Sequence, residues 1–203
     1  MKNSNIHDAS GQLSGYLYQV LSALLLLLEH ENPESKICIE KFDDVAFIDN
    51  ELPQVMIQTK HQLYQQGNLN DTSVDLWRTI KSWCDYIKTK SAVIEETSFI
   101  ILTTAHAKEN TAAFYLKTAS RDCKKALTLL QTAAIAKSVK DNEKRYDAFL
   151  SLETKTQEVL VNRIFIIDNA PTIADIQKRI MPYIRMVTIQ PYEQAVYEKI
   201  VGW

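Results

Sequence analysis

The stretch DDVAFIDNELPQVMIQTK, residues 43–60, decides the fold. It holds two short apolar runs separated by Asn-Glu-Leu-Pro, in which Asn and Pro are turn formers. Side chains alternate across a strand, so Val45 would face one side of a sheet and Asp44 the other. In the second run, Gln58 and Lys60 would share one face. The stretch therefore predicts a β-hairpin whose apolar faces pack on one core and whose polar side chains meet on the opposite face.

This polar group has a specific chemical character. A carboxylate from Asp44, an amide oxygen from Gln58 and an ammonium group from Lys60 would lie close together. Oxygen donors suit a hard divalent cation such as Mg2+, with Mn2+ as a substitute. A cation with a charged group beside it is what phosphodiester cleavage requires. The hairpin thus indicates a candidate site for metal-dependent phosphodiester hydrolysis.

Asp44 followed by Gln58-x-Lys60, and preceded by Gly-Tyr-Leu-Tyr-Gln at residues 15–19, resembles the PD-(D/E)xK nuclease superfamily. More narrowly, the chain is similar to the N-terminal nuclease domain of CBASS SAVED effectors and of Lamassu and other ABC-three-component anti-phage systems. The motifs cover residues 10–62, and a compatible strand and helix order extends to 104. Gln58 stands where the superfamily name expects Asp or Glu. The resemblance implies a Mg2+-dependent DNA endonuclease with little sequence specificity, acting as the effector of a bacterial anti-phage system.

The resemblance also implies roles for individual residues. Asp44, Gln58 and the Thr59 carbonyl would hold the metal ion, and Lys60 would sit beside the scissile phosphate. There it would orient or help deprotonate the attacking water and offset developing negative charge. Glu40, four residues before Asp44, is a candidate second carboxylate for catalysis or metal binding. We expect Gln58 to weaken metal binding, because it supplies no negative charge.

Three further residues are candidate supporting groups. In the resembling families the first helix leans on the active site, so Gln19 could hydrogen-bond a catalytic group or a phosphate. The alternative is that Tyr18 and its neighbours simply pack. A regular strand would point Asp43 away from Asp44, which favours a structural role for Asp43, whereas a β-bulge would exchange the two.

The order of predicted elements is helix, three strands, helix and strand, which is the order of the nuclease core. We predict an α/β fold with a restriction-endonuclease-like core: a mixed four- to five-stranded sheet flanked by helices, plus an inserted helical lobe. The predicted strands are 36–42, 45–49, 54–61, 99–103 and 163–168. The predicted helices include 14–29 with Ser14 as N-cap, one starting at a Thr72–Asp75 capping box and running to 88, and one capped by Thr172 that Pro182 ends or kinks.

These elements favour a single nuclease domain over residues 1–203. Its core would comprise 10–104 and 161–190, and the helical insertion would comprise 107–160, a segment without Gly or Pro. Residues 62–71 are expected to form a polar loop. The helix expected at 193–203 suggests the N-terminal part of a longer protein, with a C-terminal sensor domain or an SMC-like ATPase partner.

Composition narrows the function classes. Three widely spaced cysteines form no CxxC pair, which indicates neither a zinc site nor a disulfide framework and favours a reducing cytoplasm. The resemblance implies that this cytoplasm is bacterial. Val20–Leu28 is apolar but shorter than the roughly 20 residues that span a bilayer, so we expect a buried helix and no membrane partner. No glycine-rich phosphate loop supports an NTPase.

The net charge of −2 means that binding to double-stranded DNA must rely on local basic surfaces. The candidate clusters are Lys81, Lys88 and Lys90; Arg121, Lys124 and Lys125; and Lys137, Lys140, Lys144 and Arg145. Each is interleaved with acidic residues, which favours a solvated helix face, although one of them could follow a DNA backbone. The activity of such a nuclease must be controlled, and we expect a homo-oligomer to form on activation. Two alternatives stay open: a catalytically inactive nuclease-fold module that binds DNA or a partner protein, and a structural subunit whose residues 107–160 make protein contacts only.

Overall fold

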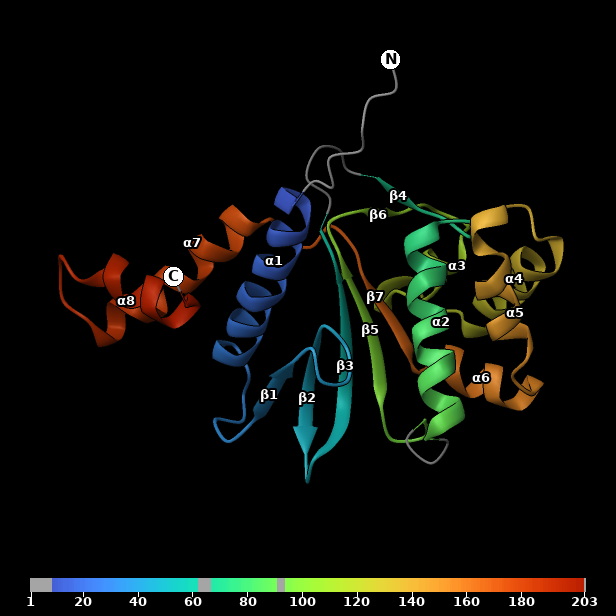
Figure 1. Cartoon of the computed structure of the whole chain (residues 1–203), viewed down its shortest axis with the longest axis horizontal. Helices are drawn as coiled ribbons and strands as arrows, with labels where there is room; N and C mark the ends of the chain where they lie inside the picture. The colour runs from blue at the N-terminus through green and yellow to red at the C-terminus, as the bar shows by residue number, and fades with distance from the viewer. Residues whose placement is uncertain (1–8, 62–66, 91–93, 203) are drawn as a thin grey trace, which may run out of the picture. The chain divides into compact units, whose positions relative to one another are not determined.

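The computed structural model describes residues 9–61, 67–90 and 94–202. They divide into two compact units, one formed by Lys36–Ala170 and the other by Met1–Ser35 together with Pro171–Trp203. The first unit contains all the strands of the sheet and the hairpin of residues 43–60 (Figure 1). We describe each unit separately.

The predicted hairpin is confirmed. β2 (Val45–Asp49) has the predicted bounds and pairs antiparallel with β3 (Leu52–Lys60), with Val45 opposite Ile57. The turn contains two residues, Asn50 and Glu51, which both have positive φ angles (46° and 66°). Such two-residue turns match the twist of the strands that they connect. β3 therefore starts two residues earlier than predicted and includes Pro53.

The α/β fold class is also confirmed. β1 (Lys36–Ile39) pairs antiparallel with β2, while β5 (Ser98–Thr103) and β7 (Ile164–Ile167) continue the sheet in parallel with β3. The five-stranded mixed sheet has the order β1-β2-β3-β5-β7. The prediction for β1 was three residues too long, since the strand ends at Ile39 and residues 40–44 form a loop.

The helix that follows the hairpin packs on one face of the sheet. α2 (Val74–Thr89) places Trp77, Ile80 and Trp83 in the main core, which they share with strand residues such as Met56. Its predicted capping box is wrong, because Ser73 occupies the N-cap. The Thr72 hydroxyl instead donates a hydrogen bond to Asn70 Oδ1 (2.9 Å).

Both sheet faces are buried, which corrects the prediction of one core on the Val45 face. Met56 on the face of Gln58 is 1% exposed, and Val45 on the other face is fully buried. The site face is therefore also the face that carries α2. The polar residues lie where this packed face reaches the ends of β2 and β3.

The helices between β5 and β7 belong to the same unit as the sheet. They are α3 (Ala112–Tyr115), η2 (Thr118–Ser120), α4 (Cys123–Ala136), η3 (Lys140–Asn142), α5 (Glu143–Leu150) and α6 (Thr154–Arg163). In the view of Figure 1, α2 lies between the strands of the sheet and the helices α4, α5 and α6. The sequence analysis predicted neither β4 (Asn68–Leu69), which lies in the predicted polar loop, nor β6 (His106–Ala107), which lies at the start of the predicted helical insertion. These two short strands pair in parallel.

The other unit consists of α1 (Ala9–Leu28), α7 (Ile173–Val187) and α8 (Glu193–Val201). Residues of α1 such as Leu21 pack in one apolar cluster with Ile180 and Ile184 of α7. The Thr172 cap is confirmed, and Thr172 and Asp175 form a complete capping box. The Ser14 cap is wrong, because Ser14 lies inside α1. Of the two effects predicted for Pro182, ending the helix is excluded, because Pro182 lies inside α7.

Within the described residues, α1 contains one segment, Gly11–Leu28, that is long and apolar enough to cross a membrane by length and composition alone. A core helix of a soluble protein meets the same criteria. Because α1 packs on α7 in a shared cluster, this unit has the form of a soluble domain.

Candidate functional site

The loop between β1 and β2 forms one wall of the site. It leaves the strand at Glu40, whose φ angle is 59°, in the left-handed region that costs a non-glycine residue about 1–2 kcal/mol. The Glu40 N–H donates to the Asp44 carbonyl oxygen (3.1 Å) and closes the loop. Glu40 is therefore an exposed loop residue, which corrects its predicted placement in the strand 36–42.

Asp44 is fixed against β3 by two short hydrogen bonds. Its Oδ2 accepts from both the N–H and the hydroxyl of Thr59, each at 2.8 Å. In an extended strand the N–H and the carbonyl of one residue project to the same side, so the Thr59 carbonyl also points toward the β2 side of β3. This arrangement leaves Asp44 Oδ1 available for a ligand, with the Thr59 carbonyl on the same side.

Asp43 lies beside Asp44 and does not point away from it. Asp43 Oδ1 accepts from the Asp44 N–H (3.0 Å), and Oδ2 accepts from the indole N–H of Trp83 (2.6 Å). Burial, helped by the nearby Asp44 charge, raises the pKa of Asp43 to about 6, although the hydrogen bonds from Trp83 and the Asp44 N–H and the charge of Lys60 act to lower it. Near neutral pH the Asp43 carboxylate is thus held at a free-energy cost.

Trp83 is the contact that the sequence analysis missed. The side chain is fully buried in α2 and lies 5.1 Å, between ring centroids, from Phe99. A buried indole N–H needs a hydrogen-bond partner, which is the signal that the sequence carried. The partner itself, Asp43, lies 40 residues away in the chain.

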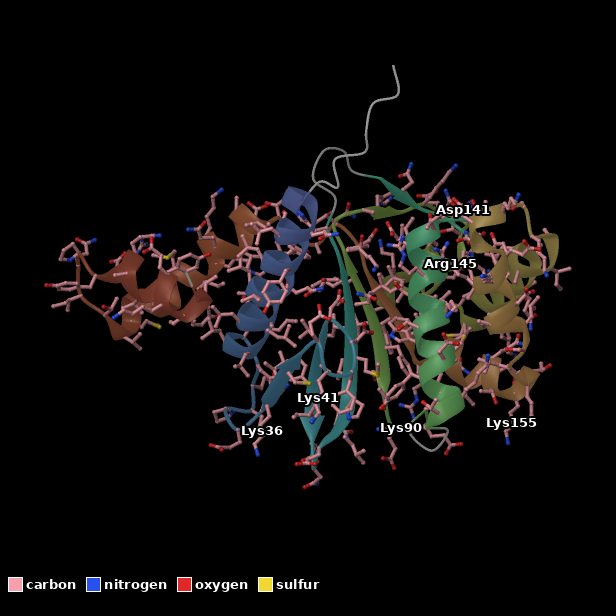
Figure 2. All side chains as sticks on the ribbon, viewed as in Figure 1. Lys36, Lys41, Lys90, Asp141, Arg145 and Lys155 are labelled. Carbon is pink, nitrogen blue, oxygen red and sulfur yellow. The ribbon has the colours of Figure 1, made fainter. Side chains whose placement is uncertain are left out.

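These groups surround a hollow of about 290 Å³. It is lined by Glu40, Lys41, Phe42, Asp43, Asp44, Gln58 and Ser82. The structure therefore brings together four of the predicted site residues, the three acids and Gln58. Figure 2 places Lys41 on the β1–β2 side of the unit.

Lys60 lies two residues beyond Gln58 on the same face of β3, outside the lining of the hollow. Burial lowers the pKa of the Lys60 ammonium, and Arg78 acts in the same direction, while Asp44, Asp75 and Asp43 partly oppose the change. Lys60 is thus a half-buried cation in the field of the carboxylates, and it gives up its proton more readily than an exposed lysine.

Tyr18 and Gln19 belong to the other unit. Tyr18 is fully buried in the apolar cluster of α1 and α7. Burial raises the pKa of its hydroxyl to about 12, against a hydrogen bond with Ser22 that lowers it. This placement favours the packing role for Tyr18. Gln19 Oε1 is buried without a hydrogen-bond partner in the described part of the chain.

The side chains around the hollow supply few of the groups that usually hold a metal ion. Residues 9–61, 67–90 and 94–202 contain no group of three His, Cys, Asp or Glu side chains placed to hold a metal. The hollow nevertheless offers oxygen donors alone: the carboxylates of Asp43 and Asp44 and the amide of Gln58. Hard donors of this kind fit Mg2+, which binds through one or two carboxylates and retains several waters.

Some cations of the predicted basic clusters have partners within the chain. Lys81 pairs with Asp85, and Lys137 pairs with Asp147. Arg121 is not available to a partner, because its guanidinium donates to three backbone carbonyls and stacks on the ring of Phe165 at 3.9 Å. Each cluster therefore has at least one cation that is held by an intramolecular contact.

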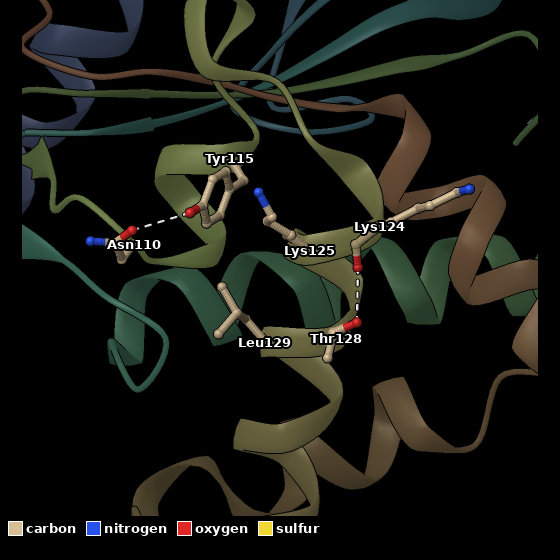
Figure 3. Close-up of a pocket in the computed structure, with 6 residues that line it drawn as sticks. All are labelled: Asn110, Tyr115, Lys124, Lys125, Thr128 and Leu129. Atoms are coloured by element: carbon tan, nitrogen blue, oxygen red, sulfur yellow. Dashed lines mark hydrogen bonds between the residues drawn. The ribbon is translucent and has the colours of Figure 1, made fainter.

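A second hollow, of about 370 Å³, lies over α3 and α4 (Figure 3). Lys125 forms part of it, yet this lysine pairs with Asp122 (3.1 Å) and lies 5.1 Å from the centre of the Tyr115 ring. The Tyr115 hydroxyl donates to Asn110 (3.1 Å). The polar side chains of Asn110, Tyr115, Lys125 and Thr128 therefore already have partners within the chain.

No model of a protein family and no curated protein matches this chain.

Proposed function

We propose that this chain is a metal-dependent DNA endonuclease with little sequence specificity, and that it acts as the effector of a bacterial anti-phage system. The proposal rests on the contact between the residue that precedes β2 and the end of β3. There the Asp44 carboxylate is pinned to Thr59, with Gln58 and Lys60 following on one face of β3. The order α1, β1, β2, β3, α2 and β5, which holds when β4 of the small second sheet is set aside, supports the same conclusion.

Each residue of the site has a separate role in this proposal. Asp44, Gln58 and the Thr59 carbonyl hold Mg2+, and Asp43 or Glu40 binds it directly or through water. When bound, the cation supplies charge stabilisation at the phosphate oxygens. Lys60 lies beside the phosphate and offsets the negative charge that develops during hydrolysis.

The substrate in this proposal is double-stranded DNA. None of the residues assigned here reads base edges, so binding would depend on backbone phosphates and would weaken steeply with salt. Such an enzyme must be restrained in its host. We propose a cytoplasmic protein that oligomerises on activation and responds to a C-terminal sensor domain or an SMC-like ATPase partner.

One specific observation favours a second function. Gln58 replaces a carboxylate, and the described residues form no three-acid group. A catalytically inactive module of the same fold, binding DNA or a partner protein, would need no stronger metal site. This alternative predicts DNA binding that is unchanged by loss of Lys60.

Cleavage of supercoiled plasmid in Mg2+, then in Mn2+, tests the proposal. Asp44→Asn and Lys60→Met should each reduce the rate at least 100-fold, because they remove a metal ligand and a charge-stabilising cation. Lys36→Met is the matched control, an exposed lysine at the start of β1 (Figure 2). Cleavage that survives both site variants would refute the assignment. DNA binding without cleavage would favour the inactive module.

A further inference from the structure

A second cluster of titratable side chains lies at the carboxyl ends of the parallel strands. Asp168 directly follows β7, and His106 lies in β6, three residues after the end of β5. Lys117 follows α3. In open α/β sheets, ligands bind outside the carboxyl ends of the strands. The cluster thus occupies the edge of the sheet at which functional groups collect.

Asp168 is the centre of this cluster. Its side chain is 7% exposed, and its Oδ1 lies 2.7 Å from the Lys117 ammonium. Its Oδ2 accepts from the Ala107 N–H (3.0 Å) and lies 3.2 Å from His106 Nδ1. Burial acts to raise the pKa of Asp168, but Lys117, the Ala107 N–H and His106 together hold it below its usual value. Asp168 is therefore an ionised and rigidly held acceptor.

His106 is bound through one nitrogen only. The ionised Asp168 favours the tautomer with a proton on Nδ1, which leaves the lone pair on Nε2. The side chain is 48% exposed, and no group of the described chain hydrogen-bonds to Nε2. Asn169 Nδ2 also lies 3.3 Å from Nδ1, but an amide N–H cannot donate to a nitrogen that carries a proton, so the shorter contact with Asp168 sets the tautomer. An oriented imidazole with an accessible Nε2 is the arrangement of a general base.

The strand register relates this cluster to Lys60. Lys60 pairs with Thr103 of β5, and Leu102 pairs with Ile167 of β7. The same register, continued by one residue, places Asp168 opposite Thr103. Since neighbouring strands lie about 4.8 Å apart, the backbones of Lys60 and Asp168 are roughly 10 Å apart. β2 and its hollow flank β3 on the other side, so Lys60 lies between the hollow and the cluster.

We propose that His106 is the general base of the hydrolysis and that Asp168 is its positioning residue, an inference that rests on the function proposed above. A phosphate held beside Lys60 would have the hollow on one side and His106 on the other. This placement matches the in-line geometry of phosphoryl transfer, in which the attacking and leaving oxygens lie on opposite sides of phosphorus.

The step balances without another reactant. The oxygen of a water molecule forms a bond to phosphorus while its proton passes to His106 Nε2. The bond from phosphorus to the leaving ester oxygen breaks, and that oxygen takes a proton from solvent water. His106 then returns its proton to solvent, so that one phosphodiester and one water give one phosphomonoester and one alcohol. In this scheme Lys60 stabilises charge and does not deprotonate the water.

Single-turnover cleavage of a labelled DNA duplex by the full chain, in Mg2+, tests this role. His106→Ala should reduce the rate by about 10²–10⁴-fold, the usual contribution of a general base. Added imidazole should restore part of the rate in His106→Ala and none in Lys60→Met. Asp168→Asn should give a smaller loss that imidazole does not restore, because in this variant the His106 ring is present but wrongly oriented. His30→Ala, in the other unit, is the matched histidine control and should stay within twofold of the wild type.

The outcomes separate the two proposals. A wild-type chain that cleaves and a His106→Ala variant within twofold of it would overturn the role of His106 and leave the nuclease intact. A rate loss in folded His106→Ala without imidazole rescue would also overturn it and assign the cluster a structural role. A wild-type chain that cleaves no substrate would overturn both proposals. Thermal unfolding of each variant establishes that it is folded.

Discussion

Replacement of Asp43 by Asn tests the electrostatic description of the site. The Asp43 carboxyl is half-buried, and burial raises its pKa from 3.8 to about 6. The folded chain therefore binds more protons than the unfolded chain between these two values, and stability falls as the pH rises through them. At about 1.4 kcal/mol for each pKa unit, an ionised Asp43 costs the folded state about 3 kcal/mol above pH 6.

Asn removes this charge and keeps one acceptor for the Trp83 N–H. The structure also shows what it loses: the second carboxylate oxygen accepts from the Asp44 N–H (3.0 Å), a hydrogen bond worth about 1 kcal/mol. We therefore expect Asp43→Asn to be more stable than the wild type by about 2 kcal/mol at pH 7.5 and less stable by about 1 kcal/mol at pH 3.5, where the wild-type carboxyl is neutral and only the lost hydrogen bond counts.

Urea unfolding followed by circular dichroism, at several pH values without divalent cations, measures this difference. Asp141→Asn is the control, an exposed carboxyl away from the β1–β2 loop (Figure 2), and it should change stability by less than about 0.5 kcal/mol. In Mg2+ the stability of the wild type should rise to that of Asp43→Asn, because a bound cation stabilises the ionised site. A variant that is less stable at pH 7.5, or one that keeps the pH dependence of the wild type, would refute the reasoning.

Three further changes have defined outcomes. Trp83→Phe keeps the ring but removes the 2.6 Å hydrogen bond to Asp43, so it should lower stability at pH 7.5 by about 1–2 kcal/mol and raise the pKa of Asp43 further, as measured by the same titration. Thr59→Val removes the hydroxyl that binds Asp44 and should cost about 1.5–3 kcal/mol in urea unfolding at pH 7.5; no loss would mean that the backbone N–H alone holds Asp44. Thr172→Ala deletes one half of the α7 capping box, with an expected loss of about 1 kcal/mol that an unchanged unfolding midpoint would contradict.

Local sequence signals predicted the elements whose packing agrees with them. Val45–Asp49 and the Thr172 cap were predicted correctly because alternation, turn residues and capping chemistry act over a few residues. Pro182 does not end α7, because the helix buries Ile176, Ile180 and Ile184, whose packing opposes the cost of about 3 kcal/mol for an internal proline.

The site was predictable in composition and less so in geometry. The acids and Gln58 do line one hollow, but the placement of Asp43 depends on the left-handed backbone at Glu40 and on a tryptophan 40 residues away. The His106 and Asp168 pair depends on the register of β7 against β5, which the sequence of either strand alone does not specify.

The claim that the hollow beside Asp44 binds a divalent cation is tested most directly by crystals grown in Mn2+. Anomalous scattering locates the ion without reference to activity. The account predicts a peak within about 2.5 Å of Asp44 Oδ1 and the Gln58 amide oxygen, which disappears in Asp44→Asn crystals. An empty hollow at millimolar Mn2+, or an ion bound only elsewhere on the chain, would contradict it.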